Sequence, residues 1–206
     1  MAPPGLCELT ELQRHANRLF GFTASKTLEV AQSLYENHKV LSYPRTDSRH
    51  LSASTAATLG SVVDAIRGNY EGLLAPGTGD RPLGKRHVDD SQVTDHHAII
   101  PTDRRATNLN DEERKLYDLV CRRLLQAWHG DFVWAATTVV TEVRSSATDL
   151  FHSTGTAVEL QGWKVLDLGG ARKVPKKKAD DDDTDDAERT LPAGLEKGVP
   201  VRVVEA

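Results

Sequence analysis

The 206-residue sequence is poor in the residues that define several protein classes. Its two cysteines, Cys7 and Cys121, exclude a disulfide scaffold and a thiolate metal cluster, and they indicate a reducing compartment. No apolar run approaches the roughly 20 residues of a membrane-spanning helix. Positive charge is not in excess either: 26 Lys and Arg against 30 Asp and Glu give a net charge of -4, which argues weakly against a nucleic-acid partner. We expect a cytoplasmic protein with no membrane partner.

The remaining composition is that of a globular protein with a substantial core. Hydrophobic residues make up 38% and charged residues 27% of the chain, and the mean hydropathy is -0.46. A chain of this length is comfortable for two domains and can bury most of its apolar surface. Composition therefore predicts two domains and is silent about chemistry.

Helical patterns dominate the first two-thirds of the sequence. Thr10 followed by Gln13 fits a capping box, apolar residues behind it recur at helical spacing, and Gly21 ends the run. Further helix starts are indicated by the capping residues Thr23, Ser52 and Asn110. From Phe132 the period changes, and segments rich in Val, Thr and Trp predict strands at 132–143, 149–160, 163–168 and 199–204.

These patterns predict a multi-domain α+β fold. We expect a mainly helical domain over residues 12–131, joined to an antiparallel β domain made of residues 5–11 and 132–206. A charged loop lies within the second domain at about 171–190, where a lysine cluster precedes an acidic run. Blocks of like charge of this kind are typical of disordered loops.

Two features invite a metal-site interpretation. The acidic run at 180–186 lacks the glycine and the distal glutamate of an EF-hand loop. His96 and His97 are adjacent, so in an extended chain their side chains point to opposite faces, and no third ligand stands at a suitable spacing. We therefore expect this chain to bind no metal.

The segment from Leu41 to Arg49 holds the residue types of a phosphoryl-transfer site. Pro44 keeps the residue before it extended, so Tyr43 and Arg45 project from one face. An arginine binds phosphate through two parallel hydrogen bonds, and its charge favours phenolate over phenol. Spacing alone leaves a second interpretation open, in which a tyrosine packs at the end of a strand beside an arginine in solvent.

Three ordered blocks of the sequence resemble the type IA DNA topoisomerases, closest to their topoisomerase III branch. Residues 42–49 read Ser-Tyr-Pro-Arg-Thr-Asp-Ser-Arg and are similar to the active-site tyrosine motif of that family. Residues 93–102 read Val-Thr-Asp-His-His-Ala-Ile-Ile-Pro-Thr, and a further match lies upstream at 12–36. The resemblance covers about residues 8–170 and implies the central part of the toroid that these enzymes form.

The resemblance also implies a reaction: transesterification of single-stranded DNA through a 5′-phosphotyrosyl intermediate. Tyr43 would be the nucleophile, Arg45 would stabilise charge on the phosphoryl oxygens, and His96 would contact the scissile phosphate or move a proton. DNA contacts are expected from Arg45, Thr46, Ser48, Arg49, His96 and His97. Thr46, Asp47 and Ser48 are expected to position the loop and the backbone rather than to do chemistry.

In the family, Mg²⁺ is bound by a separate Toprim domain, and the sequence offers no match to one. We therefore expect a central fragment whose partners are single-stranded DNA and the Toprim and remaining domains of a parent enzyme, and which is inactive without them. In a bacterium, such an enzyme would associate with the nucleoid. A second hypothesis stays open: a non-catalytic module that binds single-stranded DNA or docks onto a partner.

The net charge of -4 is an average over unlike parts of the chain. Basic residues gather around the tyrosine and in the loop before the histidines, at Lys39, Arg45, Arg49, Arg81, Lys85 and Arg86. A local positive groove is enough to hold a single strand of DNA. The overall charge therefore does not exclude the DNA partner.

Overall fold

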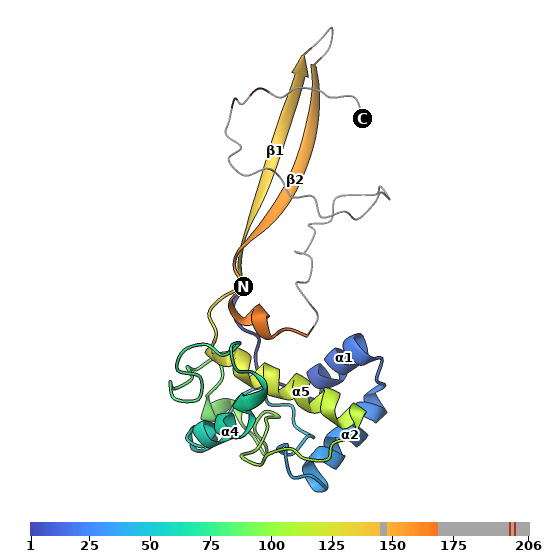
Figure 1. The fold of residues 1–206 in the computed structure, drawn as a ribbon, viewed down its shortest axis with the longest axis vertical. Helices are drawn as coiled ribbons and strands as arrows, with labels where there is room; N and C mark the ends of the chain where they lie inside the picture. The colour runs from blue at the N-terminus through green and yellow to red at the C-terminus, as the bar shows by residue number, and fades with distance from the viewer. Residues whose placement is uncertain (145–147, 169–197, 199, 201–206) are drawn as a thin grey trace. The chain divides into compact units, whose positions relative to one another are not determined.

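A computed structural model describes residues 1–144, 148–168, 198 and 200. The described chain forms two compact units. The first, the helical unit, holds residues 1–132 and 161–168, and the second is a hairpin of two strands, β1 (Val133–Arg144) and β2 (Thr148–Leu160). Figure 1 shows the elements of both units. Helices combined with an antiparallel sheet agree with the predicted α+β class.

Five α-helices build the helical unit: α1 (Leu9–Phe20), α2 (Ala24–Glu36), α3 (Ala53–Ala56), α4 (Leu59–Ile66) and α5 (Asp111–Leu125). The side chains of Thr23, Ser52 and Asn110 cap α2, α3 and α5 as predicted. At α5 the cap is a complete capping box, because the Glu113 carboxylate also accepts from the backbone N–H of Asn110. Gly21 ends α1 in the left-handed conformation, with φ of 71°.

Two details of the predicted helices were wrong. The first helix is capped by Glu8 and not by Thr10, because the Glu8 carboxylate accepts from the backbone N–H groups of Thr10 at 2.6 Å and Glu11 at 2.9 Å. The single helix expected after Ser52 is divided into α3 and α4.

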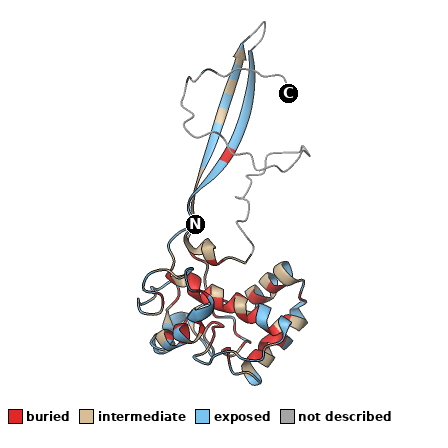
Figure 2. Cartoon of the chain, in the orientation of Figure 1, coloured by how far each residue is buried: buried red, intermediate tan, exposed pale blue. Residues whose placement is uncertain are grey.

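The core of the helical unit forms where α1 and α2 pack against α5 (Figure 1). Leu12 of α1, Leu34 of α2 and Leu116 of α5 are all fully buried. Each lies on the apolar stripe of its helix, as the 3.6-residue period requires. Figure 2 shows that buried residues concentrate in this unit.

The structure places two parts of the predicted β domain, residues 5–11 and 161–168, in the helical unit. Residues 5–11 contribute buried Leu6 and Cys7 to the helical core. The strand expected at 163–168 is wrong: a 3-10 helix spans Gly162–Leu166 and buries Leu166 in the same core. Gly162 has φ of 49°, and a Cβ there would lie 2.2 Å from the carbonyl oxygen of Asp131, so only glycine fits this turn.

The hairpin confirms the two longest predicted strands. β1 and β2 pair antiparallel over their length, with Thr137 opposite Gly155. Figure 2 shows β2 exposed along its length, and Gly155 is its one buried residue. The predicted strand at 199–204 and the predicted charged loop at about 171–190 lie outside the described residues.

Candidate active site

The two sequence blocks at 42–49 and 93–102 lie side by side in the helical unit. Their backbones are joined by three hydrogen bonds of 2.9 Å: Ser42 N to Ile100 O, Thr102 N to Val40 O and Ala98 N to His50 O. The segment before α1 joins them, because Ile99 N donates to Cys7 O at 2.8 Å. Motifs far apart in sequence therefore form one short ladder of extended chains.

Tyr43 stands at the centre of this arrangement between two other rings. Its ring centroid lies 4.3 Å from that of His96, with the planes inclined at 39°. On another side the ring of Tyr35, from α2, meets Tyr43 edge-on at 5.5 Å. Pro44 directly follows Tyr43 and is buried, and its ring restricts the backbone next to the phenol-bearing residue. The structure thus brings the predicted Tyr43 and His96 together.

Tyr43 is also set apart from two of the three other tyrosines of the chain. Tyr70 and Tyr117 are buried, and burial raises the pKa of both phenols far above the ordinary value. The Tyr70 hydroxyl in addition donates to the Asp118 carboxylate at 2.6 Å. Tyr43 and Tyr35 are half-buried and so remain within reach of a substrate.

Arg45 is exposed beside Tyr43. Within the described part of the chain it has no hydrogen bond or ion pair. Its guanidinium therefore keeps all five of its donors available for an anionic ligand. Asp47, two residues on, is exposed as well.

Thr46 and Ser48 are buried, and their hydroxyls hold the loop to the histidine block. The Thr46 hydroxyl donates to the His96 carbonyl at 3.0 Å, and it accepts from the Ser48 N–H at 3.1 Å. The Ser48 hydroxyl donates to the carbonyl of Gln92 at 2.9 Å. These contacts fix the backbone of His96 relative to the backbone of the tyrosine loop.

Arg49 turns toward α1. Its guanidinium lies 3.2 Å from the Glu8 carboxylate and 3.4 Å from the Glu11 carboxylate. The N–H of Leu9 also donates to the Thr46 carbonyl at 3.0 Å, so the start of α1 and the tyrosine loop are joined twice. Two carboxylates already engage this arginine, in contrast to Arg45.

His97 lies apart from the Tyr43–His96 pair. Its Nδ1 atom is 2.7 Å from the carbonyl oxygen of Ala98. The side chain lines a pocket together with Ser42 and with residues of α3 and α4. Adjacent residues of an extended chain point to opposite faces, which is why His96 and His97 separate.

Sequence reasoning missed one contributor to the site, Tyr35, and named Lys39 only as one of the basic residues around the tyrosine. Tyr35 reaches Tyr43 from α2, and the exposed Lys39 has φ of 57°, in the left-handed region, where the chain turns from α2 into the tyrosine segment. The Lys39 ammonium lies 5.7 Å from the Tyr35 ring centre. Nothing local in the sequence indicates which loop Tyr35 meets.

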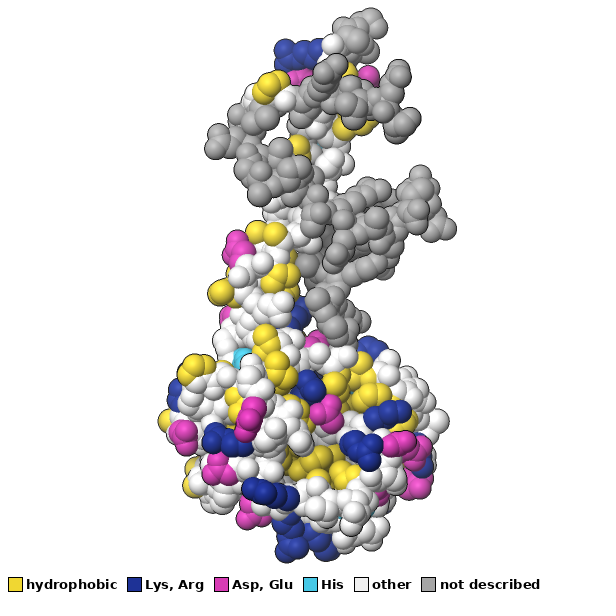
Figure 3. All heavy atoms as spheres, in the orientation of Figure 1, with side chains coloured by type: hydrophobic (Ala, Val, Ile, Leu, Met, Phe, Trp, Pro, Cys, Tyr) yellow, Lys and Arg dark blue, Asp and Glu magenta, His cyan; other side chains and the backbone are white. Residues whose placement is uncertain are grey.

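The predicted basic residues do not form one uniform patch. Figure 3 shows Lys and Arg side chains interspersed with Asp and Glu on the visible face of the helical unit. Arg81 donates to the Trp128 carbonyl, and the Trp128 indole donates back to the Arg81 carbonyl at 2.7 Å. Part of the basic set therefore has a structural role, while Lys39 and Arg45 remain exposed near the tyrosine.

Over the described ranges, no group of three or more His, Cys, Asp or Glu side chains is arranged to hold a metal ion. The described residues therefore offer no such site for the Mg²⁺ that the resemblance implies for a complete enzyme.

Comparison with known proteins identifies the family of this chain. Residues 1–206 match the family model described as DNA topoisomerase. The chain belongs to this family, in its type IA class. Two similar relatives are both named DNA topoisomerase 3: that of Bacillus subtilis (strain 168) is 40% identical over 200 residues, and that of Bacillus thuringiensis (strain Al Hakam) is 41% identical over 199 residues.

Each of these matches covers 95% of this chain and 26% of the relative, so the chain spans about a quarter of the length of these relatives. The fold is also similar to full-length topoisomerase I from Thermotoga maritima, with a TM-score of 0.54 and 22% identity over 87% of this chain and 29% of that one. None of the described helices is long and apolar enough to cross a membrane.

Proposed function

We propose that this chain carries the nucleophile of a DNA strand-cleavage and religation reaction, with Tyr43 as the attacking residue. The observation that carries the proposal is the contact of Tyr43 with His96, 4.3 Å between ring centroids, beside an arginine whose donors are free. Family membership supports the same chemistry. The proposed substrate is single-stranded DNA, as the resemblance to the type IA enzymes implies.

The reaction exchanges one phosphodiester for another. The Tyr43 phenolic oxygen attacks phosphorus and loses its proton, a bond forms to the 5′ phosphate, and the bond to the 3′ oxygen breaks. The 3′ oxygen takes up a proton and leaves as a hydroxyl. Religation runs the same steps in reverse. Because the two ester bonds are of similar energy, no ATP is consumed.

His96 and Arg45 have the two other proposed roles in the cleavage reaction. A tyrosine has a reference pKa of about 10, so a neighbouring group must assist its ionisation near neutral pH. We assign His96, whose ring lies against the phenol, to the scissile phosphate or to proton movement. We assign the Arg45 guanidinium to the phosphoryl oxygens, on which negative charge grows in the transition state.

The complete reaction requires more than these residues. We propose that this chain acts with the Toprim and remaining domains of a longer enzyme, as the central part of its toroid, and that the Mg²⁺ of that enzyme is bound by the Toprim domain. The Mg²⁺ would supply positive charge near the scissile phosphate. Arg49, Thr46, Ser48 and His97 stay proposed DNA contacts, although the two hydroxyls also hold the loop.

The alternative is a non-catalytic module that binds single-stranded DNA or docks onto a partner. It gives no account of why Tyr43 lies against His96 with Arg45 free beside it. The two hypotheses differ in one readout, a covalent adduct between protein and DNA.

The experiment combines this chain with a separately supplied Toprim domain, Mg²⁺ and a single-stranded oligonucleotide labelled at its 3′ end. Denaturing electrophoresis should show the label attached to the protein, because the 5′ phosphate of the downstream piece is the one joined. A 5′ label should stay with the released DNA. Tyr35→Phe is the matched control, since Tyr35 touches Tyr43 and should leave the adduct in place.

A further inference from the structure

A pocket of about 270 Å³ lies in the helical unit beside the tyrosine segment. Ser42 and His97, the sequence neighbours of Tyr43 and His96, both line it. Because neighbouring residues of extended chain point to opposite faces, the pocket lies behind the ladder that presents Tyr43 and His96. The other lining residues come from α3, α4 and the turn between them, from the ladder strand at 100–102 and from the residue after it: Thr55, Thr58, Ser61, Val62, Ile100, Pro101, Thr102 and Asp103.

Most hydroxyl groups that line this pocket donate their proton within the protein. Four of them donate to backbone carbonyls at 2.8–3.3 Å: Ser42 to Ala98, Thr58 to Thr55, Ser61 to Thr58 and Thr102 to Lys39. A hydroxyl has a single proton and two lone pairs. Ser42 and Thr102 each use one lone pair to accept a backbone N–H, from Ile100 and Arg104, so what these four hydroxyls keep for a ligand is their remaining acceptor capacity.

His97 and Asp103 add to the same character. The Ala98 carbonyl can only accept, so the proton of a neutral His97 imidazole sits on Nδ1, and Nε2 is left as an acceptor. Asp103 is exposed at the rim and, when ionised, it too only accepts. A phosphate group, with its negative charge and acceptor oxygens, is poorly suited to such a lining.

The floor and the size restrict the ligand further. Val62, Ile100 and Pro101 are buried residues that form an apolar side of the pocket. The volume is just below the about 300–1,000 Å³ of pockets that hold drug-sized molecules. A flat ring with donor groups on its edge fits both the apolar floor and the acceptor rim.

We propose that this pocket binds one nucleobase of the single-stranded substrate, and that it selects bases bearing an exocyclic amino group. Cytosine and adenine present that amino group on their pairing edge, whereas thymine presents two carbonyl oxygens around a single N–H. Those carbonyls would face the acceptors of the lining. The proposal rests on the proposed function, because DNA held at Tyr43 is what brings a base to Ser42.

Free nucleosides test the pocket without requiring DNA binding. In amide NMR titrations of the 206-residue chain, deoxycytidine and deoxyadenosine should shift the signals of His97 and Thr58. Thymidine should bind about three- to tenfold more weakly, the value of roughly one net hydrogen bond. Inorganic phosphate should leave these signals unchanged. Equal affinity for thymidine, or a shift caused by phosphate, overturns the proposal.

Two variants sharpen the test. Thr58→Val keeps the shape of an exposed side chain and removes an acceptor, so it should reduce the preference for deoxycytidine. Asp103→Asn introduces a donor and should strengthen thymidine binding. Asp80→Asn removes the same charge outside the pocket and should leave the affinities for all three nucleosides unchanged. A preference that persists in both pocket variants contradicts the proposal.

Fluorescence anisotropy with twelve-nucleotide homopolymers separates base selection in the pocket from DNA binding by the chain. Tighter binding of dC and dA oligomers than of dT oligomers supports the proposed function and the base selection by the pocket. Nucleosides that bind in the pocket while no oligomer binds would overturn the proposed function and leave the pocket assignment standing. If oligomers bind without base preference and nucleosides cause no NMR shifts, the assignment of the pocket is overturned and the proposed function is not.

Discussion

The rings of Tyr43 and His96 lie with their centroids 4.3 Å apart, although they belong to two separate blocks of the sequence. The Thr46 hydroxyl, bonded to the His96 carbonyl, holds the two blocks together. The contact places a group that can carry a proton directly against the phenol. The catalytic roles proposed for both residues depend on this geometry.

Replacing His96 by alanine should slow adduct formation and leave the fold intact, since the side chain is exposed. If it moves a proton, the loss should be about 10²-fold or more. Single-turnover cleavage of a 3′-labelled oligonucleotide measures the rate. His152→Ala, a change at an exposed histidine of β2, is the control. Equal rates for the two variants would remove His96 from the mechanism.

Arg45→Ala should reduce the cleavage rate more than it weakens DNA binding, because the guanidinium acts on charge that develops in the transition state. Arg45→Lys should recover only part of the rate, since an ammonium cannot bind two phosphoryl oxygens in parallel. Arg105→Ala removes an equal charge from another exposed arginine. Equal losses in rate and in affinity would reduce Arg45 to a positioning contact.

Much of the helical unit could be predicted because its signals are local. Caps at Thr23, Ser52 and Asn110 depend on residues within one turn, and all three hold. The strand predicted at 163–168 failed because its apolar residues turn into the helical core through the tight turn at Gly162. A pattern of residue types does not say which partner will bury them.

The candidate site was predicted in a different way. Spacing alone put Tyr43 and Arg45 on one face, while the role of His96 came from the family resemblance and not from any short-range signal. The edge-on contact of Tyr35 with Tyr43 could not be predicted, because it depends on how α2 is oriented toward the loop. The engagement of Arg49 by Glu8 is a tertiary contact of the same kind.

Glu8→Ala should destabilise the helical unit by about 1 kcal/mol, the typical value of an N-terminal helix cap. The change removes two hydrogen bonds at the start of α1 and one of the two carboxylates that hold Arg49. Chemical denaturation followed by circular dichroism measures the effect. Glu36→Ala, at the exposed end of α2, should cost much less. Equal costs would show that the Glu8 contacts contribute little.

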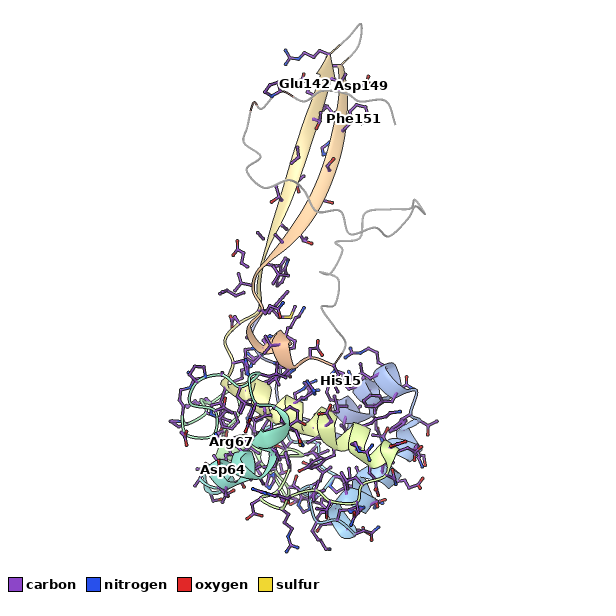
Figure 4. All side chains as sticks on the ribbon, in the orientation of Figure 1. His15, Asp64, Arg67, Glu142, Asp149 and Phe151 are labelled. Carbon is purple, nitrogen blue, oxygen red and sulfur yellow. The ribbon has the colours of Figure 1, made fainter. Side chains whose placement is uncertain are left out.

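Stability should also depend on pH through His15, a residue of α1 whose side chain contacts Arg123 of α5 (Figure 4). Burial, reinforced by the Arg123 guanidinium 2.7 Å from Nδ1, lowers the pKa of His15 from 6.5 to about 4. Between these two pH values, the unfolded chain binds a proton at His15 and the folded chain does not. The free energy of unfolding should therefore decrease as the pH falls from about 6.5 to about 4.

Denaturation midpoints measured across this pH window, for the parent chain and for His15→Gln, test the assignment. The variant should show a shallower dependence, with a remainder from His87 and His129, whose pKa values burial also lowers. His152→Gln should leave the slope unchanged. An undiminished slope in His15→Gln would mean that other groups carry the effect.

The most direct test of Tyr43 as the nucleophile is the identity of the residue that becomes joined to DNA. The adduct formed with the Toprim domain and Mg²⁺ can be digested and its nucleotide-bearing peptide sequenced by mass spectrometry. We predict a 5′-phosphoryl link on Tyr43, no adduct in Tyr43→Phe, and nearly unchanged oligonucleotide binding by that variant. An adduct on any other residue, or one that survives Tyr43→Phe, would contradict the assignment.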